Sequence, residues 1–317
     1  MAIQERFITS EEEAKKFIAE QAAKIKEEVG NDKAIVALSG GVDSAAVALL
    51  GHQALDEQLK VIFVDHGLMR AGEPDWVVKT FAESGIKVEV MKADDLFFGN
   101  LAGKTHPNDK RVAIRNSFYN EVLPQAAKEW EAKYLLQGTI LTDIEATAQD
   151  SKAPQHNVLE QIGINIDSKL VEPLKELRKP SVRQVAKALG LPESVWNRMP
   201  FLGPALAGRV VGEVTREKVV IIRKATVIVE EELEDTGAFQ YFVTLVHHEV
   251  PNNDRTKIGY AVAVRCVDSQ DAVTASPTKI EWEKMIAIRD RIYQEIPEVF
   301  RVCWDLSEKP PAAVEWV

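Results

Sequence analysis

Only two cysteines occur in the 317-residue sequence, Cys266 and Cys303, and they form no CxxC pair. The sequence therefore predicts neither a zinc site nor a redox disulfide, and two small buried side chains are the simpler interpretation. No stretch approaches the roughly 20 apolar residues that a membrane-spanning helix requires. Residues 1–30 also contain no apolar block of the signal-peptide kind. We therefore expect a cytoplasmic protein that does not contact a membrane.

Runs of lysine and arginine are missing as well. The formal net charge is −10 and the pI is about 5.3, a balance that does not favour electrostatic binding of nucleic acid. Internal repeats and low-complexity segments are not found. The hydrophobic content of 45% is that of a globular protein with a sizeable core, and the chain is long enough for two domains.

The most informative stretch is residues 33–50, KAIVALSGGVDSAAVALL. An apolar strand leads into a glycine-rich loop and then into an apolar helix. Gly40 and Gly41 permit a sharp turn and bring backbone N–H groups close to a ligand. Ser39, Asp43 and Ser44 add polar side chains at the positive end of the helix dipole. The pattern predicts a site for a phosphate chain, although the lysine of a Walker A loop is missing.

Short apolar strands at 60–64, 87–91 and 134–136 alternate with helical stretches. This alternation predicts an α/β fold with a doubly wound parallel sheet, whose ligands lie beyond the carboxyl ends of the strands. Val64, Asp65 and Gly138 all lie at such ends. We expect the chain near Asp65 to meet adenine or ribose, and Gly138 to let the backbone pass close to a nucleotide.

Residues 141–170 show little periodicity and are interpreted as a polar loop. Asp143 and Glu145 in this loop are candidates to hold magnesium or to orient an attacking group. A solvated acidic loop is the alternative, and the residues alone favour it.

The second half of the chain has a different pattern. Two prolines and several glycines at 197–212 indicate a hinge, and the segments after it alternate between helix and strand. We expect domains at 1–200 and 201–317, the second a smaller α+β domain. Its few strands cannot bury both faces of a sheet, which favours a homodimer.

The S-G-G-x-D-S loop resembles that of the N-type ATP pyrophosphatases. Over its whole length the chain resembles the ATP pyrophosphatase subunit of GMP synthetase, in the separate-subunit form of archaea. The matching stretches include ALSGGVDS at 37–44, FVDHGLMR at 63–70, QGTI at 137–140, VEPLKEL at 171–177 and KPPAAVEW at 309–316. The resemblance implies an adenine nucleotide alpha hydrolase-like domain followed by a dimerisation domain.

The resemblance also implies a ligase that uses ATP and Mg²⁺ to adenylate XMP, releases AMP and pyrophosphate, and forms GMP. Ammonia would come free or from a separate glutamine amidotransferase subunit. Mg²⁺ would be held mainly by the ATP phosphates, with Asp43 as the candidate protein ligand. The implied residues are Ser39, Gly40, Gly41, Val42, Asp43, Ser44, Val64 and Gly138 for ATP; Asp43, Ser44, Lys110, Asp143 and Glu145 for catalysis; and Arg209, Gln240, Arg265, Lys309 and Glu315 for the acceptor.

Several segments depart from the family pattern. Leu96 replaces an arginine, the basic run at 110–116 is altered, and Ala205 replaces a glycine, the residue that permits positive φ or a close approach of the backbone to a ligand. These segments are expected to close over pyrophosphate or to shape the acceptor pocket. Two alternatives stay open: a paralogue that adenylates a different acceptor, and a catalytically weak nucleotide-binding dimer. A tRNA thiolase is less favoured, because the pI is acidic and no cysteine pair is present.

Overall fold

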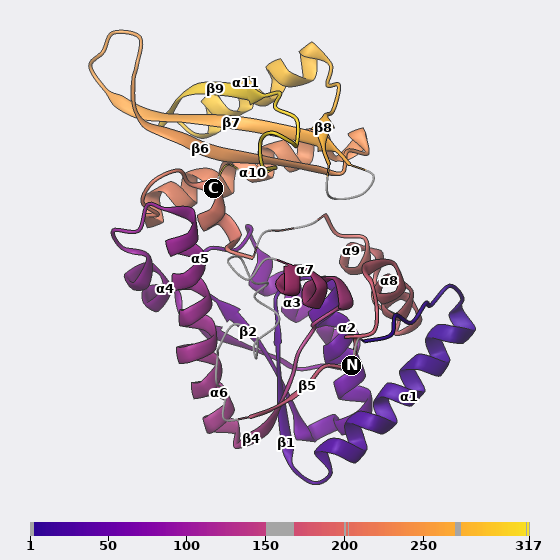
Figure 1. The fold of residues 1–317 in the computed structure, drawn as a ribbon. Helices are drawn as coiled ribbons and strands as arrows, with labels where there is room; N and C mark the ends of the chain where they lie inside the picture. Colours follow the sequence, from indigo (N-terminus) through magenta and orange to yellow (C-terminus); the bar gives the residue numbers. More distant parts are fainter. Residues whose placement is uncertain are drawn as a thin grey trace. The chain divides into compact units, whose positions relative to one another are not determined.

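The structure, a computed structural model, describes residues 3–149, 168–199, 201, 203–269, 274–314 and 316. The chain divides into two compact units (Figure 1). The first unit comprises Met1–Asp65, Gly72–Ala93 and Arg115–Arg198, and the second comprises His66–Ala71, Asp94–Ile114 and Met199–Val317. The division into domains 1–200 and 201–317 stays a prediction.

A five-stranded parallel sheet is the centre of the first unit. Its order is β3-β2-β1-β4-β5. The chain runs outward from β1 to β3 and then returns to the other side of β1, so the direction of winding reverses beside β1. Ligands of open parallel sheets bind at this reversal, beyond the carboxyl ends of the strands. The strands are β1 (Lys33–Leu38), β2 (Leu59–Asp65), β3 (Val88–Lys92), β4 (Ala132–Leu136) and β5 (Lys169–Val171).

Helices cover both faces of this sheet, with α6 on one side and α1 and α8 on the other (Figure 1). The doubly wound α/β class is therefore confirmed. The first helix begins at a capping box, in which Ser10 and Glu13 each accept the other's backbone N–H. The helices of this unit are α1 (Glu11–Val29), α2 (Val42–Leu55), η1 (Asp56–Gln58), α3 (Glu73–Ala82), η2 (Ser117–Val122), α6 (Leu123–Trp130), α7 (Leu141–Gln149), α8 (Lys179–Ala188) and α9 (Glu193–Trp196).

The expected loop at 141–170 is wrong in its first part, because α7 occupies Leu141–Gln149. The carboxylate of Asp143, at the third position of this helix, accepts the backbone N–H of Ile140, the residue before the helix, at 3.1 Å and so caps its start. A cap of this kind stabilises a helix whose apolar periodicity is weak. The later part of the segment, 150–167, lies outside the described residues.

The second unit is built on β6 (Gln240–Pro251) and β7 (Ile258–Asp268), which pair antiparallel. β8 (Ser276–Pro277) pairs antiparallel and β9 (Val299–Asp305) parallel with β7. Long apolar stripes on α10 and α11 pack against this sheet and against each other. The expected α+β arrangement is confirmed. The helices are α4 (Asp94–Leu101), α5 (Pro107–Asn116, which ends in the first unit), η3 (Ala205–Arg209), α10 (Arg216–Leu233), η4 (Glu234–Thr236) and α11 (Trp282–Glu295).

Among the residues that the structure describes, no helix is both long and apolar enough to cross a lipid bilayer.

Candidate active site

The loop between β1 and α2 is braced by its own serines. The hydroxyl of Ser44 accepts the N–H of Ser39 at 3.1 Å and contacts the Gly41 carbonyl at 3.1 Å. Ser39 Oγ lies 3.0 Å from Ser44 Oγ and accepts the Gly41 N–H at 3.4 Å. Gly40 has φ +77°, in the region that favours glycine. The result is a tight turn at the N-terminus of α2, where the helix dipole favours an anion.

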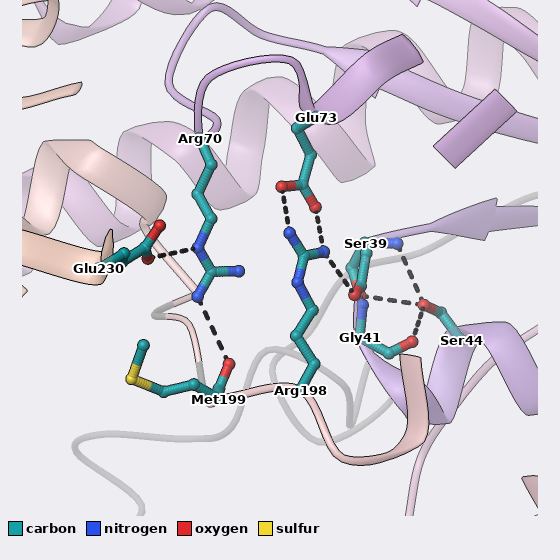
Figure 2. A network of polar contacts seen from close by, with 9 residues as sticks. Ser39, Gly41, Ser44, Arg70, Glu73, Arg198, Met199 and Glu230 are labelled. Carbon is teal, nitrogen blue, oxygen red and sulfur yellow. Dashed lines mark hydrogen bonds and ion pairs between the residues drawn. The ribbon is translucent and has the colours of Figure 1, made fainter. Parts of the chain in front are cut away.

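An arginine from the end of the first unit lies against this loop (Figure 2). Arg198 donates to both carboxylate oxygens of Glu73, at 2.5 and 2.6 Å, and to the Gly40 carbonyl at 3.2 Å. Its guanidinium also stacks on Trp76, with 4.2 Å to the ring centroid. The Glu73 side chain is only 2% exposed, so the charge pair is part of the packing around the loop.

Asp43 lies in the first turn of α2 and faces two basic side chains of α8. Its Oδ2 accepts from Lys179 Nζ at 2.5 Å, whereas Oδ1 is buried without a hydrogen-bond partner among the described residues. Burial raises the pKa of Asp43, the charge of Asp143 adds to this, and Lys179 and Arg183 oppose it. The loop thus holds a carboxylate whose neighbours include both signs of charge.

This carboxylate fits a magnesium ion shared with a phosphate chain. Within the described residues, no three His, Cys, Asp or Glu side chains gather into a metal site. Mg²⁺ usually keeps several waters and binds proteins through one or two carboxylates together with substrate phosphates. The buried, unpartnered Oδ1 of Asp43 is a suitable oxygen for such an ion.

Asp143 and Glu145 make contacts that stabilise α7 and the segment before α8. Asp143 caps α7 while its charge acts on Asp43. Glu145 accepts from Arg178 at 2.7 Å, and Arg178 also pairs with Glu5 at 3.0 Å. Asp143 is therefore near the loop, and Glu145 anchors the segment that precedes α8. Their catalytic roles stay predictions.

Gly138 follows β4 and lies directly against the start of α2. A Cβ at this position would be 3.1 Å from the Asp43 carbonyl carbon and 3.1 Å from the Ser44 nitrogen. Gly138 therefore packs directly on the backbone of the loop, and its predicted approach to a nucleotide stays a prediction. Val64 is buried near the end of β2, and Asp65 ends that strand, where its carbonyl accepts the Ala93 N–H at 3.0 Å.

Lys110 belongs to the second unit, where it is almost fully buried in α5. Its Nζ donates to the Val210 carbonyl at 2.5 Å. Burial, with a smaller contribution from the charge of Lys218, lowers the pKa of Lys110 to about 8. The lysine therefore holds the backbone at Val210, and its predicted catalytic role stays a prediction.

The candidate acceptor residues of the second unit are mostly buried. Arg209 packs between aromatic rings, 4.8 Å from the Phe242 centroid and 5.1 Å from that of Phe201. Gln240 is buried at the first position of β6. Lys309 exchanges two backbone hydrogen bonds with Ala275. Glu315 lies outside the described residues.

Arg265 on β7 is committed to a buried ion pair. It donates to Asp305 at 2.5 Å and to the Ser307 carbonyl at 2.9 Å. Asp305 also accepts from the Trp316 indole at 2.8 Å and from the Ser307 N–H at 2.9 Å. This network ties β7 to β9 and to the C-terminal segment, which is a structural role that the sequence patterns did not predict for Arg265.

Comparison with known proteins identifies both halves of the chain. A family model described as the PP-loop domain matches residues 11–190, and one described as the GMP synthase C terminal domain matches residues 227–316. The chain is 45% identical over 307 residues to a glutamine-hydrolyzing GMP synthase subunit of Pyrococcus furiosus, covering 95% of this chain and 97% of that protein. The chain belongs to the GMP synthase family. The resemblance drawn from the sequence motifs is thereby confirmed.

Other members of the GMP synthase family give the same result. The corresponding subunit of Thermococcus kodakarensis is 45% identical over 306 residues, covering 95% of this chain and 98% of that protein. The glutamine-hydrolyzing GMP synthase of Geobacillus kaustophilus is 43% identical over 314 residues, and the match covers 61% of that longer protein. The PP-loop match contains Asp43, Gly138 and Lys179, whereas Arg198 and Arg209 lie between the two matched regions.

Sequence reasoning missed Lys179, Glu73 and Arg198 as residues of the loop site. One signal was available for Lys179, because a lysine at the N-terminus of a helix is at the unfavourable end of the dipole unless it meets an anion. Arg198 carried no such signal, since its partners are 125 and 158 residues away in the chain.

Proposed function

We propose that this chain catalyses the ATP-dependent amination of XMP to GMP, with release of AMP and pyrophosphate. One observation carries the proposal: a phosphate loop that holds Asp43 beside Lys179 is joined in one chain to the GMP synthase C terminal domain. The match to the Pyrococcus and Thermococcus GMP synthase subunits covers nearly their whole length.

The reaction has two steps. In the first, the 2-oxygen of XMP bonds to the α-phosphorus of ATP, and the bond to the β-phosphate oxygen breaks so that pyrophosphate leaves. In the second, ammonia attacks the adenylated carbon, AMP leaves with the oxygen, and the nitrogen loses protons to become the amino group of GMP. Such chemistry requires mainly alignment of the reactants and neutralisation of phosphate charge.

The described residues suit these requirements. The N-terminus of α2 presents backbone N–H groups to the β and γ phosphates, and the hydroxyls of Ser39 and Ser44 exchange their mutual contact for phosphate oxygens. Lys179 places a positive charge beside the loop. A magnesium ion bound at Asp43 would neutralise charge on the departing pyrophosphate.

The ammonia source is a separate glutamine amidotransferase subunit, or free ammonium. The names of the relatives support this, because "glutamine-hydrolyzing" describes an activity of an assembly in which they are one of the subunits. We further propose that the acceptor is bound by residues of the second half of the chain, namely Arg209, Gln240, Arg265, Lys309 and Glu315, and that Lys110 takes part in catalysis.

We also propose that the second unit forms a homodimer. Large apolar side chains are exposed there, with 70% of Ile258, 67% of Trp282 and 67% of Leu306 accessible. A second copy would cover such side chains. Light scattering on a size-exclusion column should give twice the chain mass of 35.3 kDa; a monomer at micromolar concentration would contradict the dimer.

The deciding experiment measures pyrophosphate release from ATP and Mg²⁺ with ammonium present, with and without XMP. We expect release to depend on XMP and GMP to appear in equal amount. Pyrophosphate release that ignores XMP would instead indicate another acceptor, and ATP binding without turnover would indicate a nucleotide-binding protein without this activity.

The loop assignment is tested by Asp43→Asn. We expect this variant to lose XMP-dependent turnover by at least about a hundredfold, because the negative charge that would hold magnesium is removed. The matched control is Asp56→Asn, the same change at the other end of α2, in an exposed residue. Turnover that survives in Asp43→Asn would show that the chemistry lies elsewhere.

A further inference from the structure

The contacts of Arg198 are those of a residue that supports the loop. Its two terminal nitrogens meet both oxygens of Glu73 in a bidentate pair (Figure 2). Its guanidinium also stacks on the ring of Trp76. Bidentate arginine–carboxylate pairs combine strength with fixed geometry. Because Glu73 is 2% exposed, its charge requires a partner, and Arg198 is that partner.

The third contact of Arg198 fixes one peptide plane. Its Nη1 donates to the carbonyl of Gly40 at 3.2 Å. In a trans peptide this carbonyl and the N–H of the next residue point in opposite directions within one rigid plane. Holding the Gly40 carbonyl therefore also sets the direction of the Gly41 N–H, which donates to Ser39 Oγ at 3.4 Å within the loop.

The orientation of the peptide between Gly40 and Gly41 depends on contacts from outside the loop. Gly40 has φ +77°, and a Cβ there would collide with the Glu73 carboxylate. Glycine is conformationally permissive, so nothing in its own chemistry prevents the peptide between Gly40 and Gly41 from turning over. The hydrogen bond from Arg198 to the Gly40 carbonyl opposes that rotation, together with the longer one from the Gly41 N–H to Ser39 Oγ.

We propose that Arg198, held by Glu73, is a positioning residue that fixes the peptide between Gly40 and Gly41 and so preforms the phosphate loop. The inference rests on the proposed function in one respect, that this loop receives the phosphates of ATP. Arg198 acts on the loop through the Gly40 carbonyl, since both terminal nitrogens of its guanidinium already donate to Glu73.

The test uses the full chain and the double variant Glu73→Gln/Arg198→Met, which removes the buried charge together with its partner. The probe is α,β-methylene ATP with Mg²⁺, bound in a calorimeter without XMP. We expect its Kd, and the KM for ATP, to rise at least about tenfold, because a hydrogen bond from a charged group is lost at the loop. The KM for XMP should change less than twofold.

The matched control is Glu232→Gln/Arg291→Met, which removes an arginine–glutamate pair between α10 and α11. Both residues lie in the second unit and neither adjoins Arg198 in the chain, so the Kd for the analogue should stay at the wild-type value. Arg198→Lys keeps the positive charge but cannot form the bidentate pair with Glu73. Its Kd for the analogue should lie between those of the wild type and the double variant. A purely structural role would lower the melting temperature without producing this order.

The outcomes separate the inference from the proposed function. A folded double variant with wild-type affinity for the analogue would overturn the inference while leaving XMP-dependent turnover untouched. If the double variant binds the analogue more weakly than the wild type, but pyrophosphate release by the wild type does not depend on XMP, the inference is supported and the proposed function is overturned. A wild-type chain that does not bind the analogue would overturn both.

Discussion

Ala205 has φ +52° and is 2% exposed, at the first position of η3. The family resemblance predicts glycine here, and the positive φ gives the physical reason. A non-glycine residue in this region costs roughly 1–2 kcal/mol. The chain tolerates the substitution because neighbouring segments hold the turn, for example through the hydrogen bond from the Leu206 N–H to the Leu68 carbonyl at 2.9 Å.

We expect Ala205→Gly to stabilise the protein. The relief of backbone strain exceeds the entropy cost of a glycine, which leaves a net gain of about 0.5–1 kcal/mol in the free energy of unfolding. Urea denaturation measures the change. The control is Ala207→Gly in the same 3₁₀ helix, which lacks positive φ and should be destabilised by about 1 kcal/mol. A loss of stability in Ala205→Gly would contradict the account.

Local patterns are sufficient to predict the loop residues but not their distant partners. The succession of strand, loop and helix around Ser39 and Ser44 is encoded by neighbours in sequence, and so are the parallel strands and the capping box at Ser10. The contact between Asp43 and Lys179 joins residues 136 positions apart. Such a contact exists only after β5 has paired with β4, and no local periodicity reports it.

At the scale of elements, a single buried ion pair connects β7, β9 and the C-terminal segment. Arg265 and Asp305 have side chains that are 2% and 6% exposed. Burial alone would raise the pKa of Asp305, but hydrogen bonds from Ser307, Arg265 and Trp316 outweigh it and the pKa is lowered. The stabilisation by Asp305 is therefore present above the ordinary value of 3.8 and is lost as the pH falls through the lowered folded value.

Asp305→Asn should destabilise the protein by about 3 kcal/mol, because it leaves Arg265 buried without its charge partner. It should also release Trp316, so the tryptophan emission should shift to longer wavelength before global unfolding. The control is Asp290→Asn, in an exposed pair with Arg289, where the change should stay within about 0.5 kcal/mol. Equal effects of the two substitutions would exclude a special role for the buried pair.

Across the whole molecule, alkaline pH should increase stability through Lys110. Its folded pKa is about 8, against an ordinary value of 10.5. Between these values the unfolded chain binds a proton that the folded chain has released, so the free energy of unfolding rises with pH across this window. Below pH 8 the amine is charged in the folded and in the unfolded chain, so the full cost of burying the charge is present. The free energy of unfolding is therefore about 3 kcal/mol lower there than above the ordinary pKa of 10.5.

The corresponding measurement compares urea denaturation of the wild type and Lys110→Met from pH 7 to pH 10. The rise with pH should be reduced in the variant, which has no amine to titrate. At pH 7 the gain from removing the buried charge is partly offset, because the Val210 carbonyl loses its donor. Lys24→Met on the exposed face of α1 is the control. Parallel pH profiles for Lys110→Met and the wild type would contradict the buried, partly neutral lysine.

The glycine at position 138 limits how this protein can change over evolution. Every other amino acid carries a Cβ, and here that carbon would press on two backbone atoms of α2, which cannot rotate away as a side chain can. A substitution would therefore displace the first turn of α2 by a few tenths of an ångström, together with Asp43. Ala205 shows that mutational drift is tolerated where only torsional strain results. A substitution of Gly138 would instead move the phosphate loop. Related proteins that evolve to use a different acceptor are therefore expected to keep this glycine.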